Sequence, residues 1–400
     1  MRAMILAAGY GTRLWPLTVD RTKPAIPVLG RPLVGYVAEY LAGYGYKDVV
    51  VNLHHQPESV QRALGDGSRF GVRLHYVFEP EILGTSGAID NARDLLGDSA
   101  FVVVNGKIVT DINLTEALAT HRRTNALATL VLQRNTARDR FSIVETRDGL
   151  VTGFGGMPTR ASDNAGDSTH DAARHNNARD DAAHDTAAHA DDVRDDISDN
   201  DISDNGVRDN TVHDAAAHAD ARRNAVRNDV VDNDKARIDD DAPLMFTGIQ
   251  ILEPRIFDYI PRGVFSHSVT DVYLPAIRRG ERVAAHVAGG MWHELSTIPR
   301  YLEINLALLA AQGRDCLRGD NCFVSPEASV RQSILWDNVT IEAGASVERA
   351  ILADGVRIIA GERIEHAAVV RAELVRGQSP PPKALKGEFR GDNFVVPLPQ

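Results

Sequence analysis

The sequence has few of the features that mark a membrane or secreted protein. It contains only two cysteines, Cys316 and Cys322, and no apolar run near the roughly 18 residues that a membrane-spanning helix needs. Its first apolar run starts almost at Met1, follows the single cation Arg2 and leads straight into a glycine loop, unlike a secretion signal. We therefore expect a cytoplasmic protein with reduced thiols and no membrane partner.

An excess of positive charge is also absent. The chain has 44 Lys and Arg residues against 55 Asp and Glu residues, which gives a formal net charge of −11. Proteins that bind nucleic acids without sequence preference use clustered Lys and Arg to neutralise the phosphates. The charge balance therefore argues against a nucleic-acid partner.

One long segment lacks the residues that build a core. Between Phe154 and Leu244 there is no leucine and no aromatic residue, and Asp, Asn, Ala, His and Arg predominate. Such a composition cannot bury enough apolar surface to offset the entropy of ordering the chain. We predict a disordered insertion at about 159–242. Its histidines show no repeated ligand spacing, so a solvated linker is favoured over a metal site.

Outside this insertion, apolar runs typical of strands alternate with amphipathic stretches typical of helices. The predicted strands are 3–6, 49–53, 72–78, 101–105, 244–252 and 283–287, and the predicted helices include 34–44 and 297–311. This alternation is the pattern of an α/β domain with a doubly wound, mostly parallel sheet. Because strands are expected on both sides of the insertion, it interrupts a single domain at 1–312.

The C-terminal part of the chain repeats itself. Residues 324–340, 341–357 and 358–374 align as three repeats of seventeen residues. Apolar residues share columns in this alignment: Val324, Ile341 and Ile358 in one, and Val330, Val347 and Ile364 in another. A repeat of this kind is typical of a solenoid, here a short left-handed β-helix of hexapeptide type at 320–375. A β-sandwich is the alternative, and 376–400 is expected to be a C-terminal tail.

The clearest chemical signal is a glycine loop directly after the first predicted strand. Gly9 and Gly11 allow backbone N–H groups to approach phosphate oxygens closely, since no Cβ stands in the way. Paired glycines after a strand also occur in ordinary tight turns. Arg13 and Lys23 favour the phosphate interpretation, because two cations can offset the charge of a triphosphate where its α-phosphate is attacked.

The segment 6–28 resembles the signature of the nucleoside-diphosphate-sugar pyrophosphorylases, which join a nucleoside triphosphate to a sugar 1-phosphate and release pyrophosphate. Further segments resemble parts of the same family: 79–88, 104–106, 246–249 and 292–297. Leu83-Gly84-Thr85 and the hexapeptide-type part resemble the mannose-1-phosphate guanylyltransferases of this family. The resemblance implies an enzyme, a sugar-1-phosphate nucleotidyltransferase with its catalytic domain at 1–312.

The resemblance also implies which residues form the site. Arg13 and Lys23 would be catalytic, with Lys23 steadying the α-phosphate during in-line attack by the sugar phosphate. The nucleotide-binding residues that it implies are Leu6, Ala8, Gly9, Gly11, Thr12, Arg13, Glu79, Gly84 and Thr85. On the sugar-phosphate side they are Asn105, Gly106, Lys107, Thr247 and Gly248.

The sequence departs from the family pattern on the sugar-phosphate side. The family places a metal-binding aspartate where this chain has Lys107, and a second one where it has Glu294. Mg²⁺ is the cofactor that the family implies, with Glu294 and the nearby Asp111 as the remaining candidate ligands. A lysine cannot bind the metal, so its ammonium either supplies the missing positive charge or marks a site that has lost activity. The family's Glu-Lys-Pro is replaced by residues 156–158, and either Arg140 or an arginine of the later segments is the candidate for the missing lysine.

Two functions are compatible with these residues. The favoured one is nucleotidyl transfer from GTP, with UTP as the alternative donor, to a sugar 1-phosphate, with mannose 1-phosphate preferred. The other is a catalytically weak or inactive regulatory subunit that binds nucleotide or nucleotide sugar. In either case we expect a homo-oligomer or another assembly formed through the β-helix. A dinucleotide-binding oxidoreductase is disfavoured because the third glycine of its fingerprint is missing. A hexapeptide acyltransferase is disfavoured because the β-helix is short and has a single histidine, His366.

Overall fold

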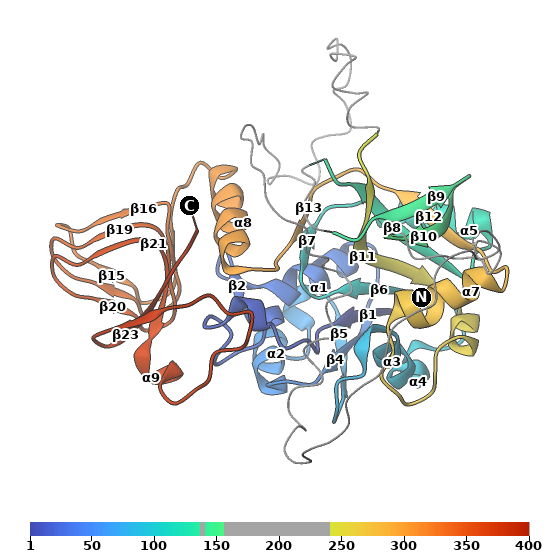
Figure 1. Cartoon of the computed structure of the whole chain (residues 1–400), viewed down its shortest axis with the longest axis horizontal. Coiled ribbons are helices and arrows are strands. Elements are labelled where there is room, and N and C mark those ends of the chain that lie inside the picture. Colours follow the sequence, from blue (N-terminus) through green and yellow to red (C-terminus); the bar gives the residue numbers. More distant parts are fainter. Residues whose placement is uncertain (137–140, 156–240, 400) are drawn as a thin grey trace, which may run out of the picture.

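A computed structural model describes residues 1–136, 141–155 and 241–399 of the chain. Nearly all of the insertion predicted at about 159–242 lies outside the described residues. The described residues form an α/β domain and a β-helix, and the β-helix lies at the left of Figure 1.

A nine-stranded sheet forms the centre of the α/β domain. Its strands are β1 (Ala3–Leu6), β4 (Asp48–Leu53), β5 (Arg73–Phe78), β6 (Phe101–Asn105), β8 (Ala128–Arg134), β9 (Val144–Arg147), β10 (Leu150–Phe154), β11 (Leu244–Leu252) and β12 (Val283–Val287). They lie in the order β5-β4-β1-β6-β11-β8-β12-β10-β9. Only β10 and β11 of these strands run against the others. This arrangement confirms the predicted α/β fold with a mostly parallel sheet.

Helices cover both faces of this sheet (Figure 1). They are α1 (Leu33–Gly43), α2 (Pro57–Leu64), α3 (Gly84–Asn91), α4 (Arg93–Leu96), α5 (Leu114–Thr124) and α7 (Leu274–Arg278). In β1, Ile5 joins the apolar cluster that contains Val37 and Leu41 of α1, whereas Met4 joins the cluster of Ile89 from α3. Side chains on a strand point alternately to its two faces, so an apolar residue at every position means that both faces are buried.

Two short antiparallel ribbons lie beside the main sheet. One pairs β2 (Pro27–Val28) with β3 (Arg31–Pro32). The other pairs β7 (Ile108–Thr110) with β13 (Trp292–Glu294), which are more than 180 residues apart in the sequence. The second ribbon brings the residue after Gly106 close to Glu294, so it positions the sugar-phosphate side of the predicted site.

Three coils of a parallel β-helix follow helix α8 (Ile298–Ala310). Its strands are β14 (Leu317–Arg318), β15 (Phe323–Val324), β16 (Ser329–Arg331), β17 (Ile334–Leu335), β18 (Thr340–Ile341), β19 (Ser346–Leu352), β20 (Arg357–Ile358) and β21 (Arg363–Arg371). Val324, Ile341 and Ile358 stack in one register, as the repeat predicts. Val330, Val347 and Ile364 stack in a second register. The structure therefore has the solenoid and not the alternative sandwich.

The β-helix extends beyond the three predicted repeats at both ends. At its start, β14 pairs with β17 and adds part of a further coil. At its end, the segment expected as a tail follows α9 (Ala372–Val375) and contains β22 (Glu388–Arg390) and β23 (Asn393–Pro397). Strand β23 pairs antiparallel with β21. Residues 376–400 thus include strands that cover the last edge of the β-helix, a position that would otherwise expose unpaired backbone groups.

One apolar cluster joins the two parts of the molecule. It contains Leu14, Trp15 and Leu17 from the segment after the glycine loop, Tyr301 from α8 and many side chains of the β-helix. The Trp15 ring meets the Phe394 ring of β23 edge-on, with 5.5 Å between centroids. The segment after the glycine loop is therefore packed against the β-helix as well as against its own domain.

Two further observations concern membrane-spanning helices and the two cysteines. In the described parts of the chain, no helix combines the length and the apolar character that crossing a bilayer requires. Cys316 and Cys322 are not joined in a disulfide. Both thiols are partly buried, and burial raises the pKa of each above its usual value, so neither is an activated nucleophile.

Candidate functional site

The glycine loop leaves the end of β1 and packs against the turn that carries Lys23. Gly11 has φ +71°, and a Cβ added to it would lie 3.0 Å from the Cβ of Lys23. Only glycine meets both requirements easily. A Cβ added at Gly9 would meet nothing within 4 Å, so this part of the loop faces open space. The loop therefore keeps an accessible backbone beside a lysine, as phosphate binding requires.

Arg13 and Lys23 each lie on a short turn of 3₁₀-helix. Arg13 belongs to the turn Thr12–Leu14, and Lys23 begins the turn Lys23–Ala25. Pro24 follows Lys23 at the start of its turn, where the ring fixes a helical backbone angle and its missing N–H is not needed. Both cationic side chains are partly exposed.

Lys107 and Glu294 form an ion pair at the ribbon of β7 and β13. The Lys107 Nζ lies 2.7 Å from Oε1 of Glu294, and the Glu294 side chain is only 12% exposed. The backbone ties the same residues together, because Leu295 N–H donates to the Lys107 carbonyl over 2.9 Å. The ammonium thus lies directly against the carboxylate that was the leading candidate metal ligand.

Three cations act on Glu294. Burial alone would raise the pKa of its carboxyl group, but the nearby cations together outweigh burial and hold the pKa below its usual range, with the charge and the hydrogen bond of Lys107 as their largest contributions. The charges of Lys23 and Arg13 lower it further. Because these effects decline with distance, the Glu294 carboxylate lies within electrostatic reach of Arg13 and Lys23, while Lys107 contacts it directly.

Both predicted metal ligands have other partners among the described residues. The other candidate ligand, Asp111, accepts the Met291 N–H at Oδ1 over 2.6 Å and so closes the turn before β13. Among the described residues, no group of three or more His, Cys, Asp or Glu side chains is arranged to hold a metal ion. Mg²⁺ prefers several oxygen ligands, and here one carboxylate already faces an ammonium. The donor set does not fit a protein-bound Mg²⁺.

On the nucleotide side, Glu79 is buried and its carboxylate is engaged within the protein. Oε1 accepts from the Asn52 side chain at 2.7 Å and Oε2 accepts the Leu83 N–H at 3.0 Å. Asn52 in turn accepts the Ala7 N–H at 2.8 Å. Burial raises the pKa of Glu79 above its usual value, although these hydrogen bonds oppose the rise. Glu79 therefore holds the start of the glycine loop through Asn52.

The sequence interpretation missed Asn52 and two residues next to it. The Tyr10 hydroxyl lies 3.1 Å from Nε2 of His54, whose Nδ1 lies 2.8 Å from the Glu79 carbonyl oxygen. Asn52 and His54 stand at the carboxyl end of β4, beside the loop that follows β1. A polar side chain in the last positions of an apolar strand is a signal that could have identified them.

Gly84 and Thr85 hold a neighbouring loop in place. A Cβ at Gly84, where φ is +70°, would lie 2.5 Å from the Ser266 carbonyl oxygen. The Thr85 hydroxyl oxygen accepts the Ser268 N–H at 2.8 Å. The structure therefore gives both residues a packing role next to Glu79, and their predicted contact with nucleotide remains a prediction.

The residues expected on the sugar-phosphate side lie at the end of β6 and in the middle of β11, where the strand's register shifts between Phe246 and Ile249. A Cβ at Gly106 would lie 2.8 Å from the Leu6 carbonyl oxygen, and one at Gly248 would lie 2.4 Å from Nδ2 of Asn105. Both glycines therefore allow close backbone approach. The Thr247 hydroxyl is buried and donates to the Val131 carbonyl at 2.7 Å, which makes it a structural group. Arg140 and residues 156–158 lie outside the described residues.

Two family models match the chain. The model described as "Nucleotidyl transferase" matches residues 2–169, and the one described as "GlmU-like, C-terminal hexapeptide" matches residues 308–375. Residues 2–169 are therefore similar to the nucleotidyl transferases, and residues 308–375 to the GlmU-like hexapeptide domains. The second match supports the predicted left-handed β-helix for the coils after α8.

Curated relatives match the N-terminal part of the chain. A UTP–glucose-1-phosphate uridylyltransferase from Synechocystis is 37% identical over 142 residues, which are 33% of this chain and 37% of the relative. An N-acetylmuramate α-1-phosphate uridylyltransferase from Neisseria meningitidis is 45% identical over 121 residues, 30% of this chain and 52% of the relative. A mannose-1-phosphate guanyltransferase from Yarrowia lipolytica is 32% identical over 152 residues, 37% of this chain and 42% of the relative. The chain thus spans about half or less of each relative's length.

Solved structures show the same fold at low sequence identity. A protein from Bacillus anthracis, assigned as a glucose-1-phosphate thymidylyltransferase, matches with a TM-score of 0.52 and 17% identity, over 78% of this chain and 95% of that one. HddC from Yersinia pseudotuberculosis, solved with GMP-PN, matches with a TM-score of 0.50 and 16% identity, over 77% of this chain and 99% of that one. At these identities the likeness establishes the fold only.

Proposed function

We propose that this protein is a sugar-1-phosphate nucleotidyltransferase, which joins a nucleoside triphosphate and a sugar 1-phosphate to give a nucleotide sugar and pyrophosphate. The observation that carries the proposal is an accessible glycine loop packed against Lys23, with Lys107 paired to Glu294 and the charges of Arg13 and Lys23 acting on the same carboxylate. Cations on both sides of one site suit a reaction that brings two phosphorylated substrates together. The match to the nucleotidyl transferase family model supports the same reaction.

The reaction needs positioning and charge neutralisation more than covalent work by side chains. A phosphate oxygen of the sugar 1-phosphate attacks the α-phosphorus of the triphosphate. A new bond forms from that oxygen to phosphorus, and the bond from the α-phosphorus to the bridging oxygen breaks. Pyrophosphate leaves with the electron pair of that bond. Arg13 and the loop amides hold the β- and γ-phosphates, and Lys23 steadies the α-phosphate.

Lys107 supplies positive charge on the sugar-phosphate side. Glu294 holds its ammonium in place, so the charge is fixed before the substrates arrive. Because the donor set does not suit a protein-bound Mg²⁺, no step of the proposal passes through such an ion. The turnover of the proposed enzyme therefore depends on Lys107 where a relative with two carboxylates would depend on a metal.

The finer specificity is part of the proposal. We favour GTP and mannose 1-phosphate, because Leu83-Gly84-Thr85 and the hexapeptide domain resemble guanylyltransferases of that sugar. Uridylyl transfer is the alternative, and two of the relatives above are named uridylyltransferases. A cytoplasmic location and a homo-oligomer formed through the β-helix belong to the same proposal.

The Lys107–Glu294 pair also favours a second candidate function, a regulatory subunit that binds nucleotide without turnover. A pyrophosphate-release assay separates the two. The purified full chain is tested with GTP and UTP against mannose, glucose and N-acetylmuramate 1-phosphates, each with Mg²⁺ and with EDTA. Release that requires both substrates supports the transferase. Nucleotide binding without release from any pair supports the regulator, and absence of nucleotide binding contradicts both.

A further inference from the structure

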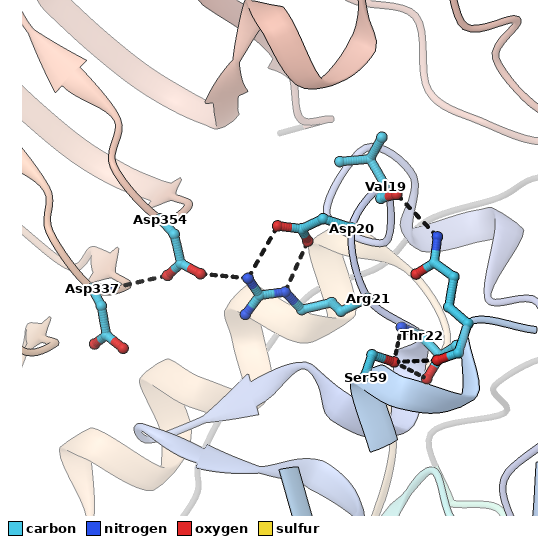
Figure 2. A network of polar contacts seen from close by, with 8 residues as sticks. Val19, Asp20, Arg21, Thr22, Ser59, Asp337 and Asp354 are labelled. Atoms are coloured by element: carbon cyan, nitrogen blue, oxygen red, sulfur yellow. Dashed lines mark hydrogen bonds and ion pairs between the residues drawn. The ribbon is translucent and has the colours of Figure 1, made fainter. Parts of the chain in front are cut away.

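Arg21 connects residues 6–28 of the α/β domain, here called the signature segment, to the β-helix. Its guanidinium forms two bonds with Asp20, at 2.9 and 3.2 Å, and a third with Oδ2 of Asp354 in the turn before β20. The guanidinium also lies over the Trp336 ring, 4.8 Å from its centroid. Figure 2 shows the arginine between the two aspartates, one from each part of the molecule.

Asp354 is itself held by the repeat of the β-helix. Its Oδ1 accepts the N–H of Asp337, seventeen residues earlier, at 3.0 Å. Asp337 accepts the N–H of Asp320 in the same way at 2.8 Å. Asp337 and Asp354 thus occupy one column of the repeat, and each uses one oxygen to join its coil to the preceding one. Asp354 uses its second oxygen to bind Arg21 (Figure 2). The carboxylate that meets Arg21 is thus fixed by the solenoid.

The opposite side of the signature segment is tied to helix α2. Thr22 N–H donates to the Ser59 hydroxyl oxygen at 3.1 Å. The Gln56 side chain donates to the Val19 carbonyl at 3.1 Å. Figure 2 shows these bonds on the side of the segment away from Asp354. Residues 19–22 are therefore held from both sides, and Lys23 is the next residue.

A second connection from the β-helix reaches the other end of the lysine turn. Trp336 Nε1–H donates to the Tyr301 hydroxyl at 2.8 Å, and that hydroxyl donates to the Pro27 carbonyl at 2.6 Å. The β-helix is therefore linked to the chain before the turn Lys23–Ala25 through Arg21, and after it through Tyr301 of α8. A flexible lysine side chain reaches a phosphate reproducibly only if its backbone is fixed, and a misplacement of about 1 Å can cost on the order of 10²-fold in rate.

We propose that Asp354 is a positioning residue for Lys23: by holding Arg21, the β-helix sets the backbone from which the lysine reaches the α-phosphate. The inference rests on the proposed transferase reaction for its kinetic consequence. Its structural part, an Asp354-dependent backbone at residues 19–25, can be measured without turnover.

Asp337 offers a matched control. Asp354→Asn and Asp337→Asn each remove one negative charge from the same column and keep an oxygen that can accept the coil-to-coil bond. Only Asp354→Asn removes the ion pair with Arg21. We expect Asp354→Asn to lower kcat about tenfold with little change in the KM for the nucleotide, and Asp337→Asn to change kcat less than about twofold.

A double-substitution experiment with Lys23 distinguishes a positioning role of Asp354 from a general loss of stability. If Asp354 acts through Lys23, then Asp354→Asn should lower kcat in the natural chain but not in a Lys23→Met background. Arg21→Gln should reproduce the effect of Asp354→Asn, and it replaces that variant if Asp354→Asn does not fold. Equal and additive losses in both backgrounds would overturn the proposal.

Hydrogen exchange provides the readout that does not need activity. In the full chain, amides of residues 19–25 should exchange about fivefold faster in Asp354→Asn than in Asp337→Asn, because one anchor of the segment is lost. Equal exchange in the two variants would overturn the inference. An inactive natural chain with the faster exchange would instead contradict the proposed reaction while supporting the role of Asp354.

Discussion

The two sides of the candidate site differ in how closely their charged residues follow the pattern of the resembled family. On the nucleotide side both the backbone and the charges suit a triphosphate: an accessible Gly9, a left-handed Gly11 against Lys23, and Arg13 nearby. On the sugar-phosphate side the backbone keeps its close approaches at Gly106 and Gly248, but a lysine stands where the resembled family has a metal-binding aspartate. The comparison teaches that the fold requires the glycines, whereas the means of supplying positive charge can differ.

The largest effect is expected on the nucleotide side. Lys23→Met removes the charge next to the α-phosphate while keeping most of the side-chain volume, and we expect kcat to fall on the order of 10³-fold. The measurement is pyrophosphate release at saturating substrates. Lys47→Met is the control, because this lysine is exposed and lies outside the site. A fall of less than about threefold in Lys23→Met would contradict the assigned role.

A somewhat smaller kinetic effect is expected on the sugar-phosphate side. Lys107→Met should lower kcat/KM for the sugar 1-phosphate on the order of 10²-fold and leave the affinity for nucleotide unchanged. It should also destabilise the fold by about 2 kcal/mol, because Glu294 loses the partner of its poorly exposed carboxylate. Denaturant unfolding measures the second effect. Lys107→Met/Glu294→Gln should recover part of the lost stability but not the activity.

Replacing the ion pair by two aspartates sharpens the comparison. Lys107→Asp/Glu294→Asp creates the pair of carboxylates that the resembled family uses, so activity should become dependent on Mg²⁺ where that of the natural chain resists EDTA. Rates with Mg²⁺ and with EDTA, measured for both proteins, test this. Equal loss of activity in EDTA for the two proteins would show that Lys107 does not take the place of a metal.

The buried hydrogen-bond network of the nucleotide side should contribute mainly to stability and loop order. Asn52→Ala leaves one oxygen of buried Glu79 and the Ala7 N–H without their partners, which should cost about 2 kcal/mol. The Kd for nucleoside triphosphate should rise at the same time. Asn91→Ala serves as the control, since Asn91 is exposed and makes one long bond to the Phe78 carbonyl. A loss of stability no larger than that of Asn91→Ala would show that Asn52 does not stabilise this network.

The pH dependence of stability should reveal the state of Glu294. Its pKa is lower in the folded protein than in the unfolded chain, so its stabilising contribution is present above the unfolded value and is lost as pH falls through the folded value. The difference in melting temperature between the natural chain and Glu294→Gln should therefore shrink as pH falls from about 5 to about 3, through the unfolded value and on toward the lower folded value. A difference that stays constant over this range would argue against the ion pair.

The smallest effect concerns the insertion. Deletion of Arg160–Asp241 should change the melting temperature by less than about 2 °C, because that segment has no leucine or aromatic residue to bury. A longer deletion, through Met245, removes the start of β11 and the bond from Asn135 N–H to the Pro243 carbonyl. It should lower the melting temperature clearly. A large loss from the first deletion would show that the segment contributes to the fold.

Much of the fold could be predicted because its elements carry strong local patterns. The strands at 3–6, 101–105, 244–252 and 283–287 have the predicted bounds, since each is a mainly apolar run. The seventeen-residue repeat gave the register of the β-helix correctly. The strands in 376–400 escaped prediction because their pairing depends on an edge formed by distant residues.

The site was predictable where a residue's role depends on the backbone, and less so where it depends on a distant partner. Gly11, Gly106 and Gly248 lie at close approaches that only glycine permits. By contrast, the pairing of Lys107 with Glu294 depends on a ribbon between segments far apart in sequence. The bonds of Glu79 to Asn52 and of Arg21 to Asp354 also join separate segments, so no local pattern could indicate them.

Nucleotide titration tests most directly whether these cations hold a triphosphate. The natural chain should bind GTP or UTP at least about tenfold more tightly than the corresponding monophosphate, and Arg13→Met/Lys23→Met should reduce that ratio to near one. If the natural chain binds the triphosphate and the monophosphate equally, or if the double substitution leaves the ratio unchanged, the assigned phosphate site is wrong.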